Sequence, residues 1–485
     1  MIDKSKTPLL DALKEIVSQP HAAFYAPGHK QGKGSSCDLV DLIGKSVLQA
    51  DLPELPELDN LFAPEGAIAQ AQKLAALAFQ ADFTWFLING SSCGIIAAIL
   101  ATCGTGEKII LPRNIHSSAI AGLVLSGAIP IFINPEYDPE VGLAYNVTPE
   151  AVASALKQDP DTKAVMMLHP TYQGICSDLE AIAQITHQYD IPLLVDEAHG
   201  AHFAFHDDLP PSALSVGADL SVQSTHKVLS AMTQASMLHL KGDRICRQRI
   251  TKALQLVQST SPSYLLLASL DAAREQVATQ GHELMTRTIA LAREARHKIA
   301  AIPKLSVLTP HKQPGCQNID PTRLTIDVSQ LGITGFAADE ILHEQLKVTC
   351  ELPLLHHLTF IISLGNTAED IQQLIKACKT LSQSAIDRTI VSPLILPHPS
   401  SFILDPSRIS PREAYFAPAE TIPIAQASDR LCGELICPYP PGIPLLMPGE
   451  IITNEAINYL QQIVTAGGTI TGCNDPTLKT IQILK

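Results

Sequence analysis

The 485-residue chain has little positive charge, no long uncharged apolar run and no signal-like start. It holds 34 lysines and arginines against 48 aspartates and glutamates, a formal net charge of −14, which disfavours a nucleic-acid partner. No run of about 18 uncharged apolar residues is present, so we expect no membrane-spanning helix. The first residues, Met1–Lys6, lack the apolar core of a signal peptide, so we expect a cytoplasmic protein.

Motifs for disulfides, metals and nucleotides are also missing. Eleven cysteines is an odd number, and the closest pair, Cys432 and Cys437, does not form a Cys-x-x-Cys motif. This usage disfavours a disulfide framework and a zinc site, and favours reduced thiols in the cytoplasm. Asp196, His199 and His202 lie close in sequence, but no third histidine or matching carboxylate is spaced to complete a metal site. The chain has no P-loop motif and no G-x-G-x-x-G after an expected strand, which argues against both kinds of nucleotide site.

Apolar residues are plentiful, and their pattern alternates. They make up 46% of the chain, enough for large buried cores, and the length predicts two or three domains. From about residue 65, strand-like runs alternate with helical patterns across short loops, which predicts an α/β fold with a mostly parallel central sheet and helices on both faces. The expected strands are 84–88, 108–111, 129–133, 164–168, 191–195 and 220–223, and the expected helices are 65–80, 93–103, 117–126, 149–157 and 178–189.

Other patterns flank this sheet. An amphipathic helix is expected at 8–17, and the polar stretch 25–34 after it reads as an arm that could dock on another subunit. A long helix is expected over 263–301, with Gly281 as the position where it would bend. The expected elements after it, which predict a small α+β domain, are strands 323–328, 347–351 and 359–364 and helices 335–346 and 367–383. The expected domains are an N-terminal arm and helix (1–64), a large domain with the candidate site (65–275), a small α+β domain (276–390), and a Pro/Ser-rich linker (391–401) that opens a C-terminal region (391–485).

Two polar motifs follow neighbouring expected strands. Asp196-Glu197-Ala198-His199-Gly200 comes after strand 191–195, and Ser224-Thr225-His226-Lys227 begins 28 residues after Asp196, behind strand 220–223. Because ligands collect at the carboxyl ends of strands in open α/β sheets, one ligand could meet the acid and the lysine together. Pyridoxal phosphate (PLP) needs this pair, since a lysine amine binds it covalently and a carboxylate partners its pyridinium nitrogen. The alternatives are a solvated lysine and an aspartate that caps the following turn.

A third motif, at 89–94, follows a strand and opens a helix. Gly90 permits a tight turn there, and a helix N-terminus attracts an anion. Ser91 and Ser92 add hydroxyl donors, and the serine and histidine that precede Lys227 could add two more. The pattern suits a phosphate, with a plain serine N-cap as the alternative.

Two further strand ends carry polar loops. His116 follows strand 108–111, and its imidazole could stack on a planar cofactor or simply lie in water at a helix start. The loop 169–174 follows strand 164–168 and reaches the same edge of the sheet. The convergence of donor-rich loops at five strand ends is a stronger signal than any one motif.

Together these motifs resemble the Orn/Lys/Arg decarboxylase family of PLP enzymes, which has the aspartate-aminotransferase fold (fold type I). The resemblance covers essentially the whole chain and is most specific at Cys437–Pro444 and Met447–Glu450. It implies PLP-dependent decarboxylation of a basic amino acid in polyamine biosynthesis, by a homodimer whose subunits share the active site. The compact length resembles the bacterial arginine/lysine decarboxylase branch, which favours arginine over lysine and ornithine. Other matching segments are Pro27–Lys30, Gln234–Met237 and Ser259–Tyr264.

The resemblance also implies a role for each matched residue. The expected catalytic residues are Lys227, which would bind PLP covalently, Asp196, which would pair with the pyridine nitrogen, and His116, which would stack on the ring. The remaining implied contacts are Gly90, Ser91, Ser92, Ser224 and His226 at the phosphate, Thr171 near the ring hydroxyl, His199 beside Asp196, and Thr260 reaching the phosphate of the neighbouring subunit.

A basic substrate needs acidic partners, for which Glu351, Glu450 and Asp59 are candidates. Each could instead be an ordinary surface or helix-end acid. Family members often show Asp-Asp-Leu-His at 59–62, where this chain has Asp-Asn-Leu-Phe, and related fold-type-I enzymes often have Asn where this chain has His169. Either departure could alter specificity.

Two other functions stay open. The first is another fold-type-I reaction, such as aminotransfer or β-elimination. An aminotransferase would carry a carboxylate-binding arginine in its small domain, where Arg323 is the main candidate. The second is a catalytically silent PLP-binding regulator of polyamine supply, which the intact Lys227, Asp196 and His116 disfavour.

Overall fold

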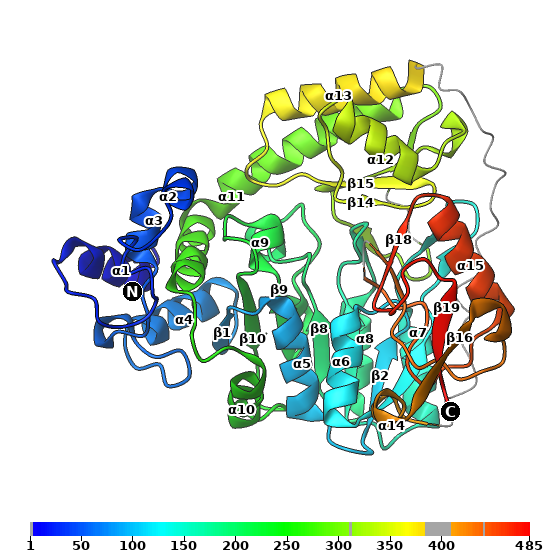
Figure 1. Cartoon of the computed structure of the whole chain (residues 1–485), viewed down its shortest axis with the longest axis horizontal. Helices are drawn as coiled ribbons and strands as arrows, with labels where there is room; N and C mark the ends of the chain where they lie inside the picture. The colour runs from blue at the N-terminus through cyan, green and yellow to red at the C-terminus, as the bar shows by residue number, and fades with distance from the viewer. Residues whose placement is uncertain (1–2, 310–312, 384–408, 440–441) are drawn as a thin grey trace. The chain divides into compact units, whose positions relative to one another are not determined.

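The computed structural model describes residues 3–309, 313–383, 409–439 and 442–485. The chain, drawn in Figure 1, forms two compact units. Unit 1 comprises Met1–Ala101 and Leu194–Met285, and unit 2 comprises Thr102–Leu193 and Thr286–Lys485. The expected linker, 391–401, lies outside the described residues.

Unit 1 contains strands in the order β1-β10-β9-β8. They are β1 (Phe83–Leu87), β10 (Ser236–Leu240), β9 (Leu220–Gln223) and β8 (Leu193–Asp196). β8, β9 and β10 are buried along their whole length, as strands covered on both faces should be. The helices of this unit are α1 (Pro8–Ser18), α2 (Cys37–Ile43), α3 (Lys45–Ala50), α4 (Ala67–Ala78), α5 (Gly90–Thr102), α9 (Thr225–Val228) and α10 (Arg247–Val257).

One strand of unit 1, β10, is not among those the sequence predicts. It runs antiparallel to both β1 and β9, whereas β8 and β9 are parallel. The chain returns from β9 to β10 through the single short helix α9, without the long helix that a parallel crossover uses. The sheet is therefore mixed rather than parallel at this side.

The first part of unit 2 follows the predicted alternation closely. Strands β2 (Lys108–Pro112), β3 (Ile129–Ile133) and β6 (Ala164–Leu168) pair in the order β6-β2-β3, and both pairs are parallel. The helices that alternate with them are α6 (Ser117–Ser126), α7 (Pro149–Gln158) and α8 (Leu179–Gln188). Thr148 caps α7 and proline opens it, and Asp178 caps α8, so both helices begin where their capping residues predict.

The second part of unit 2 is the expected small α+β fold. Its antiparallel sheet has the order β11-β13-β15-β14, and α12, α13 and the end of α11 cover one face, as Figure 1 shows. The elements are the part of α11 (Tyr264–Ala300) that follows Met285, β11 (Ser306–Val307), β13 (Arg323–Asp327), α12 (Gly335–Glu344), β14 (Leu352–Pro353), β15 (His357–Ile361) and α13 (Ala368–Gln383); the earlier part of α11 belongs to unit 1.

One expectation in this region, the strand at 347–351, needs correction. The predicted strand 347–351 is not a strand, because Lys347 has a φ of 55° and the N–H of Cys350 donates to the Asp339 carboxylate instead of a neighbouring strand. The helix α11 continues through Gly281 without interruption. A Cβ at Gly281 would lie 3.1 Å from Phe205, so the glycine allows close packing at this point of the helix.

The C-terminal part of unit 2 has its own apolar core beneath α15. Its strands pair as β16-β19 and β17-β18, both antiparallel. The elements are α14 (Pro411–Phe416), β16 (Ala419–Pro423), β17 (Cys437–Tyr439), α15 (Asn454–Thr465), β18 (Thr469–Thr471) and β19 (Thr480–Leu484). The remaining short strands of unit 2 are β4 (Tyr137–Asp138), β5 (Leu143–Ala144), β7 (Ile175–Cys176) and β12 (Asn318–Ile319).

Two global findings complete the fold. All eleven cysteines fall within the described residues, and each has a free thiol. In the part of the chain that the structure describes, no helix has the length and apolar character that a membrane span requires.

Candidate active site

The lysine and histidine of the two leading motifs meet in unit 1. Lys227 lies in α9 directly after β9, and its Nζ is 3.0 Å from Nε2 of His199. His199 is buried in the turn after β8. Because β8 and β9 are adjacent and parallel, with Asp196 opposite Val222, their ends bring both motifs to one place. The strand-end argument predicts that Asp196 and Lys227 meet one ligand, and the contact seen here joins the same two motifs through His199.

Asp196 is the buried acid of this cluster. It is only 4% exposed, and one of its oxygens accepts the N–H of Ala198 at 3.2 Å. Burial raises the pKa of Asp196, while the positive charge of Lys227 lowers it. A buried carboxylate is stable only beside a cation or strong donors, so a protonated ring nitrogen is a suitable partner for it. Asp196 and Lys227 thus have the chemistry that the ring nitrogen and the aldehyde of PLP require.

The helix N-terminus of α5 forms the second part of the cluster. Gly90 has a φ of 75°, which a glycine adopts without strain. The hydroxyl of Ser224 donates to Oγ of Ser91 at 2.6 Å, while Ser92 is exposed. A Cβ at Gly94 would lie 2.7 Å from side chains of β1 and β9, so this glycine lets α5 pack directly on the sheet. Hydroxyls and free N–H groups at a helix start fit a phosphate.

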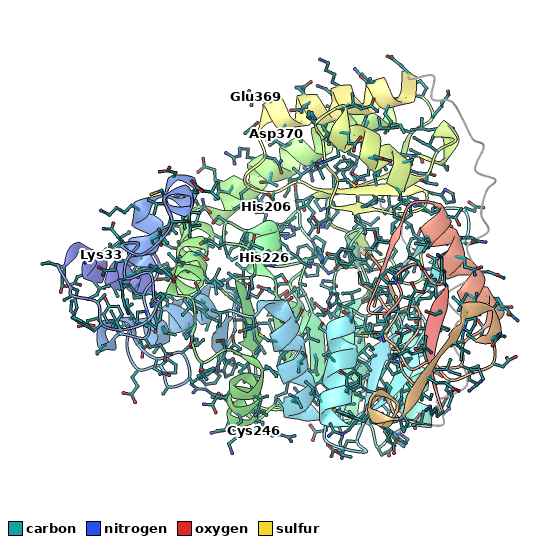
Figure 2. The ribbon with its side chains drawn as sticks, in the orientation of Figure 1. Lys33, His206, His226, Cys246, Glu369 and Asp370 are labelled. Carbon is teal, nitrogen blue, oxygen red and sulfur yellow. The ribbon has the colours of Figure 1, made fainter. Side chains whose placement is uncertain are left out.

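His226 and Thr260 lie near the rim of this cluster. His226, labelled on α9 in Figure 2, is half-buried, and burial together with the charge of Lys227 lowers its pKa. Thr260 is exposed in the loop between α10 and α11. The neighbouring Ser259 donates its N–H to Oδ1 of Asn89 at 3.1 Å, which ties this loop to the turn before α5.

His116 lies in unit 2, where it caps α6. Its Nδ1 accepts the N–H of Ser118 at 3.2 Å, so the neutral ring carries its proton on Nε2. The C-terminal motif packs against this residue: the N–H of Ser117 donates to the carbonyl of Gly442, and a Cβ at Gly442 would lie 3.4 Å from His116 Nε2.

Thr171 also belongs to unit 2, in the loop after β6. It is buried, and its backbone N–H donates to the carbonyl of Ile175, whose own N–H donates to the Thr171 hydroxyl. Gly174 in this loop has a φ of 86°, and a Cβ there would lie 2.8 Å from the side chain of Arg323. Arg323 is itself fully buried and paired with Asp320 at 3.9 Å. The arginine considered as a carboxylate clamp therefore packs beneath the Thr171 loop.

Two of the three candidate substrate acids have structural partners. Glu450 is partly buried, with 12% of its side chain exposed, lies 3.0 Å from the guanidinium of Arg113 and accepts the N–H of Met447. Asp59 accepts several backbone N–H groups at the start of α4, including those of Gly66 and Ile68. The third candidate, Glu351, is exposed beside β14.

A cavity of about 240 Å³ lies within unit 2. Thr171 and Asn114 line part of it, and Tyr137, Tyr172 and His357 line other parts. Burial lowers the pKa of His357 to about 4. The described lining includes no aspartate or glutamate. No motif in the sequence marks Tyr137 or His357, because the residues around the cavity are spread over the whole of unit 2.

Metal binding has no support in the described residues, which contain no group of three histidine, cysteine, aspartate or glutamate side chains suited to an ion. His199, considered for such a site, contacts Lys227 instead.

Comparison with solved structures defines the class of protein. The lysine decarboxylase LdcF of Francisella novicida matches with a TM-score of 0.82 and 23% identity over 99% of this chain and 81% of the other. Lysine decarboxylase A of Pseudomonas aeruginosa matches with a TM-score of 0.83 and 23% identity over 99% and 80%. An alanine–glyoxylate aminotransferase from Nostoc sp. matches 65% of this chain and 86% of its own, with a TM-score of 0.52 and 16% identity. The fold is therefore the aspartate-aminotransferase-like fold of PLP enzymes, as predicted.

Family models and relatives narrow this class further. The model "Orn/Lys/Arg decarboxylase, major domain" matches residues 7–387, and "Orn/Lys/Arg decarboxylase, C-terminal domain" matches 405–475. An arginine decarboxylase of Bacillus subtilis is 39% identical over 100% of this chain and 99% of its own length. One from Halalkalibacterium halodurans is 39% identical over the same shares. The chain belongs to the Orn/Lys/Arg decarboxylase family, and it is accordingly an enzyme that decarboxylates a basic amino acid, as the motifs predict.

Proposed function

We propose that this chain binds PLP in unit 1 and uses it to decarboxylate arginine to agmatine and CO₂, in polyamine biosynthesis. The observation that carries the proposal is the 3.0 Å contact between Lys227 and His199 beside the buried carboxylate of Asp196. PLP supplies an electron-withdrawing ring that accepts the electron pair left behind when CO₂ departs. This chain contributes the groups that hold the ring and control its charge.

The residues of unit 1 have separate tasks in this proposal. Lys227 is the covalent attachment point, and Asp196 keeps the ring nitrogen protonated by offering it a buried negative charge. Ser91 and Ser224, already in contact, join Gly90 at the α5 N-terminus to hold the phosphate. The implied list of phosphate contacts also includes Ser92 and His226.

For His116 and Thr171 the proposal rests on the family resemblance, which implies that His116 stacks on the ring face and that Thr171 lies near the ring hydroxyl. Because Nδ1 of His116 accepts a backbone N–H, the neutral ring presents Nε2–H as a hydrogen-bond donor. The acid proposed to protonate Cα of the substrate after CO₂ has left is the amine of Lys227 or, when its ring is doubly protonated, His116.

Arginine is the proposed substrate because the relatives named arginine decarboxylase are 38–39% identical. Those named lysine decarboxylase are only 24–25% identical. The cavity that Thr171 lines is a candidate pocket for the substrate side chain. Since the described lining has no acid, aromatic faces of the lining, such as those of Tyr137 and Tyr172, could hold a guanidinium.

The active enzyme is proposed to be a cytoplasmic homodimer. Thr260 is exposed, while the loop around it is tied to the turn at Asn89. An exposed hydroxyl in that position suits the phosphate of a neighbouring copy, as the resemblance implies.

The test is product analysis by mass spectrometry. PLP-loaded protein is incubated with equal amounts of arginine, lysine and ornithine, and agmatine is expected to dominate. The Lys227→Ala variant should lose all amine formation and the visible absorbance of bound PLP. The control is Lys252→Ala, which removes an exposed lysine of α10 and should behave as wild type. Dominant cadaverine or putrescine would refute arginine as the substrate, and no amine from PLP-loaded protein would refute decarboxylation.

A further inference from the structure

Glu197, the residue after Asp196, has no part in the proposed function, yet it is fully buried. Its carboxylate accepts three hydrogen bonds from two separate segments, one from the loop before β9 and two from β9. The donors are the N–H of Ala213 at 2.7 Å, the hydroxyl of Ser221 at 2.6 Å and the side-chain amide of Gln223 at 2.9 Å. A buried carboxylate that accepts this many hydrogen bonds is held in one position by its donors.

The partners of Glu197 indicate its charge. The N–H of Ala213 and the amide nitrogen of Gln223 can only donate, so a carboxylate with no proton satisfies both. Burial raises the pKa of Glu197 to about 7, against the lowering effect of its bonds to Ser221, Gln223 and Ala213. Above neutral pH the residue is therefore an acceptor toward every neighbour.

A chain of hydrogen bonds extends this arrangement across the sheet. Oε1 of Gln223 lies 3.1 Å from Nε2 of His239, and Nδ1 of His239 lies 2.8 Å from the hydroxyl of Thr84. Because the Gln223 amide nitrogen donates to Glu197, its oxygen accepts from His239 Nε2–H, and Thr84 donates to Nδ1. The strand register agrees with these contacts: Thr84 of β1 is opposite His239 of β10, and His239 is opposite Ser221 of β9. These three residues form one row across the sheet.

The Glu197 end of this series of hydrogen bonds lies at the candidate site. The two β9 donors to Glu197 come just before the segment that carries Lys227. The carbonyl of Glu197 accepts the N–H of Gly200, which closes the turn that presents His199 to Lys227. A Cβ at Gly200 would lie 2.7 Å from Cγ of Glu197, so this turn packs tightly on the glutamate side chain.

We propose that Glu197 is a positioning residue for the PLP site. Its carboxylate joins the end of β8 to the end of β9, and so fixes Asp196 and His199 relative to Lys227. The inference rests on the proposed function for its meaning, since the residues that it positions are those assigned to PLP.

Two matched variants separate positioning from general stability. Ser221→Ala and Thr84→Val each remove one buried hydroxyl from the same row of the sheet, but only Ser221 contacts Glu197. Both variants should lower the melting temperature to a similar extent. Ser221→Ala should disturb the contact between Lys227 and His199, whereas Thr84→Val should not. A third variant, Glu197→Gln, should disturb this contact as Ser221→Ala does.

The readout is the acetylation rate of Lys227 in the full-length, cofactor-free protein, measured by mass spectrometry relative to the exposed Lys252. A lost hydrogen bond to a buried charge is large enough to change such a rate about fivefold. We expect a faster rate in Ser221→Ala and Glu197→Gln, because Lys227 gains freedom from His199, and a wild-type rate in Thr84→Val. PLP should also bind more slowly to the first two variants.

Equal labelling in all variants and wild type would overturn the proposal, as would an equal increase in Thr84→Val. Acetylation needs no cofactor, so it decides the role of Glu197 even if wild-type protein fails to bind PLP. Such a failure would instead refute the proposed function. The two ideas are therefore tested by different measurements.

Discussion

His239 illustrates how burial controls a single titratable residue. It is fully buried and stacks on Phe79 with ring centroids 4.7 Å apart. Both of its nitrogens have hydrogen-bond partners, Gln223 and Thr84. Burial lowers the pKa of His239 to about 3, because the charged ring would lose its hydration. The residue therefore stays neutral in the folded protein at every ordinary pH.

This property predicts a pH dependence of stability. Between about pH 6.5 and 3 the unfolded chain binds a proton at His239 that the folded chain does not. The free energy of unfolding should therefore fall as the pH falls, by up to about 1.4 kcal/mol per unit from this residue. Urea unfolding at several pH values measures the slope, and His239→Gln should reduce it. Burial lowers the pKa of His357 to about 4, so His357 still contributes part of the slope in His239→Gln. An unchanged slope in His239→Gln would contradict the prediction.

At the scale of elements, the loop between β6 and β7 depends on one glycine. Gly174 has a φ of 86° and would bring a Cβ within 2.8 Å of Arg323. The N–H of Asp320 donates to the carbonyl of Gly174, and β7 pairs with β12, so the loop that carries Thr171 is held from both sides. The geometry of this loop thus depends on residues about 150 positions later in the chain.

Replacing Gly174 by alanine should be costly for two reasons. The left-handed backbone costs about 1 kcal/mol in any residue with a Cβ, and overpacking against Arg323 adds about 1–3 kcal/mol. Gly242→Ala is the matched control, because Gly242 has a φ of 76° and no atom lies within 4 Å of the position that a Cβ would take there. Urea unfolding should show a clearly larger loss of stability for Gly174→Ala. Equal losses would show that the contact with Arg323 has no energetic effect.

Elements also differ in how well the sequence predicts them. Helices such as α6 and α7 begin at the residues expected, because their caps and prolines are local signals. β10 escaped prediction because its five residues are buried on both faces and carry neither alternation nor a flanking helix pattern. The backbone at Lys347, with its positive φ, likewise has no sequence signature strong enough to exclude a strand there.

At the scale of the whole molecule, the proposed homodimer predicts complementation between two inactive chains. Lys227→Ala removes the attachment point of PLP, and Thr260→Asp places a negative charge where the neighbour's phosphate would lie. Each variant alone should be inactive. In a mixed dimer one site carries both defects and the other carries none, so mixing should restore part of the decarboxylase activity.

The measurement is agmatine formation before and after the two variants are mixed under conditions that exchange subunits. The control is mixing Lys227→Ala with itself after the same treatment. No recovery, although light scattering detects mixed dimers, would refute the shared site. Recovery without any dimer would refute the assignment of Thr260 to the partner's phosphate.

By itself the sequence determined the alternation of helices and strands, the family, and the motifs that carry Lys227, Asp196 and His116. Each of these depends on residues that are neighbours in the chain, where periodicity, capping and motif spacing act. Roles in the site that the motifs imply, such as those of Ser92 and Thr260, remain predictions.

Only the tertiary structure decided which buried polar groups meet. Asp59 and Glu450 were candidates for binding the substrate. Asp59 instead accepts backbone N–H groups at the start of α4, and Glu450 pairs with Arg113. The row from Glu197 through Gln223 to Thr84 joins residues more than 100 positions apart. No sequence motif marks these side chains. They pair because the folded sheet excludes water from them, so that each can form hydrogen bonds only with the others.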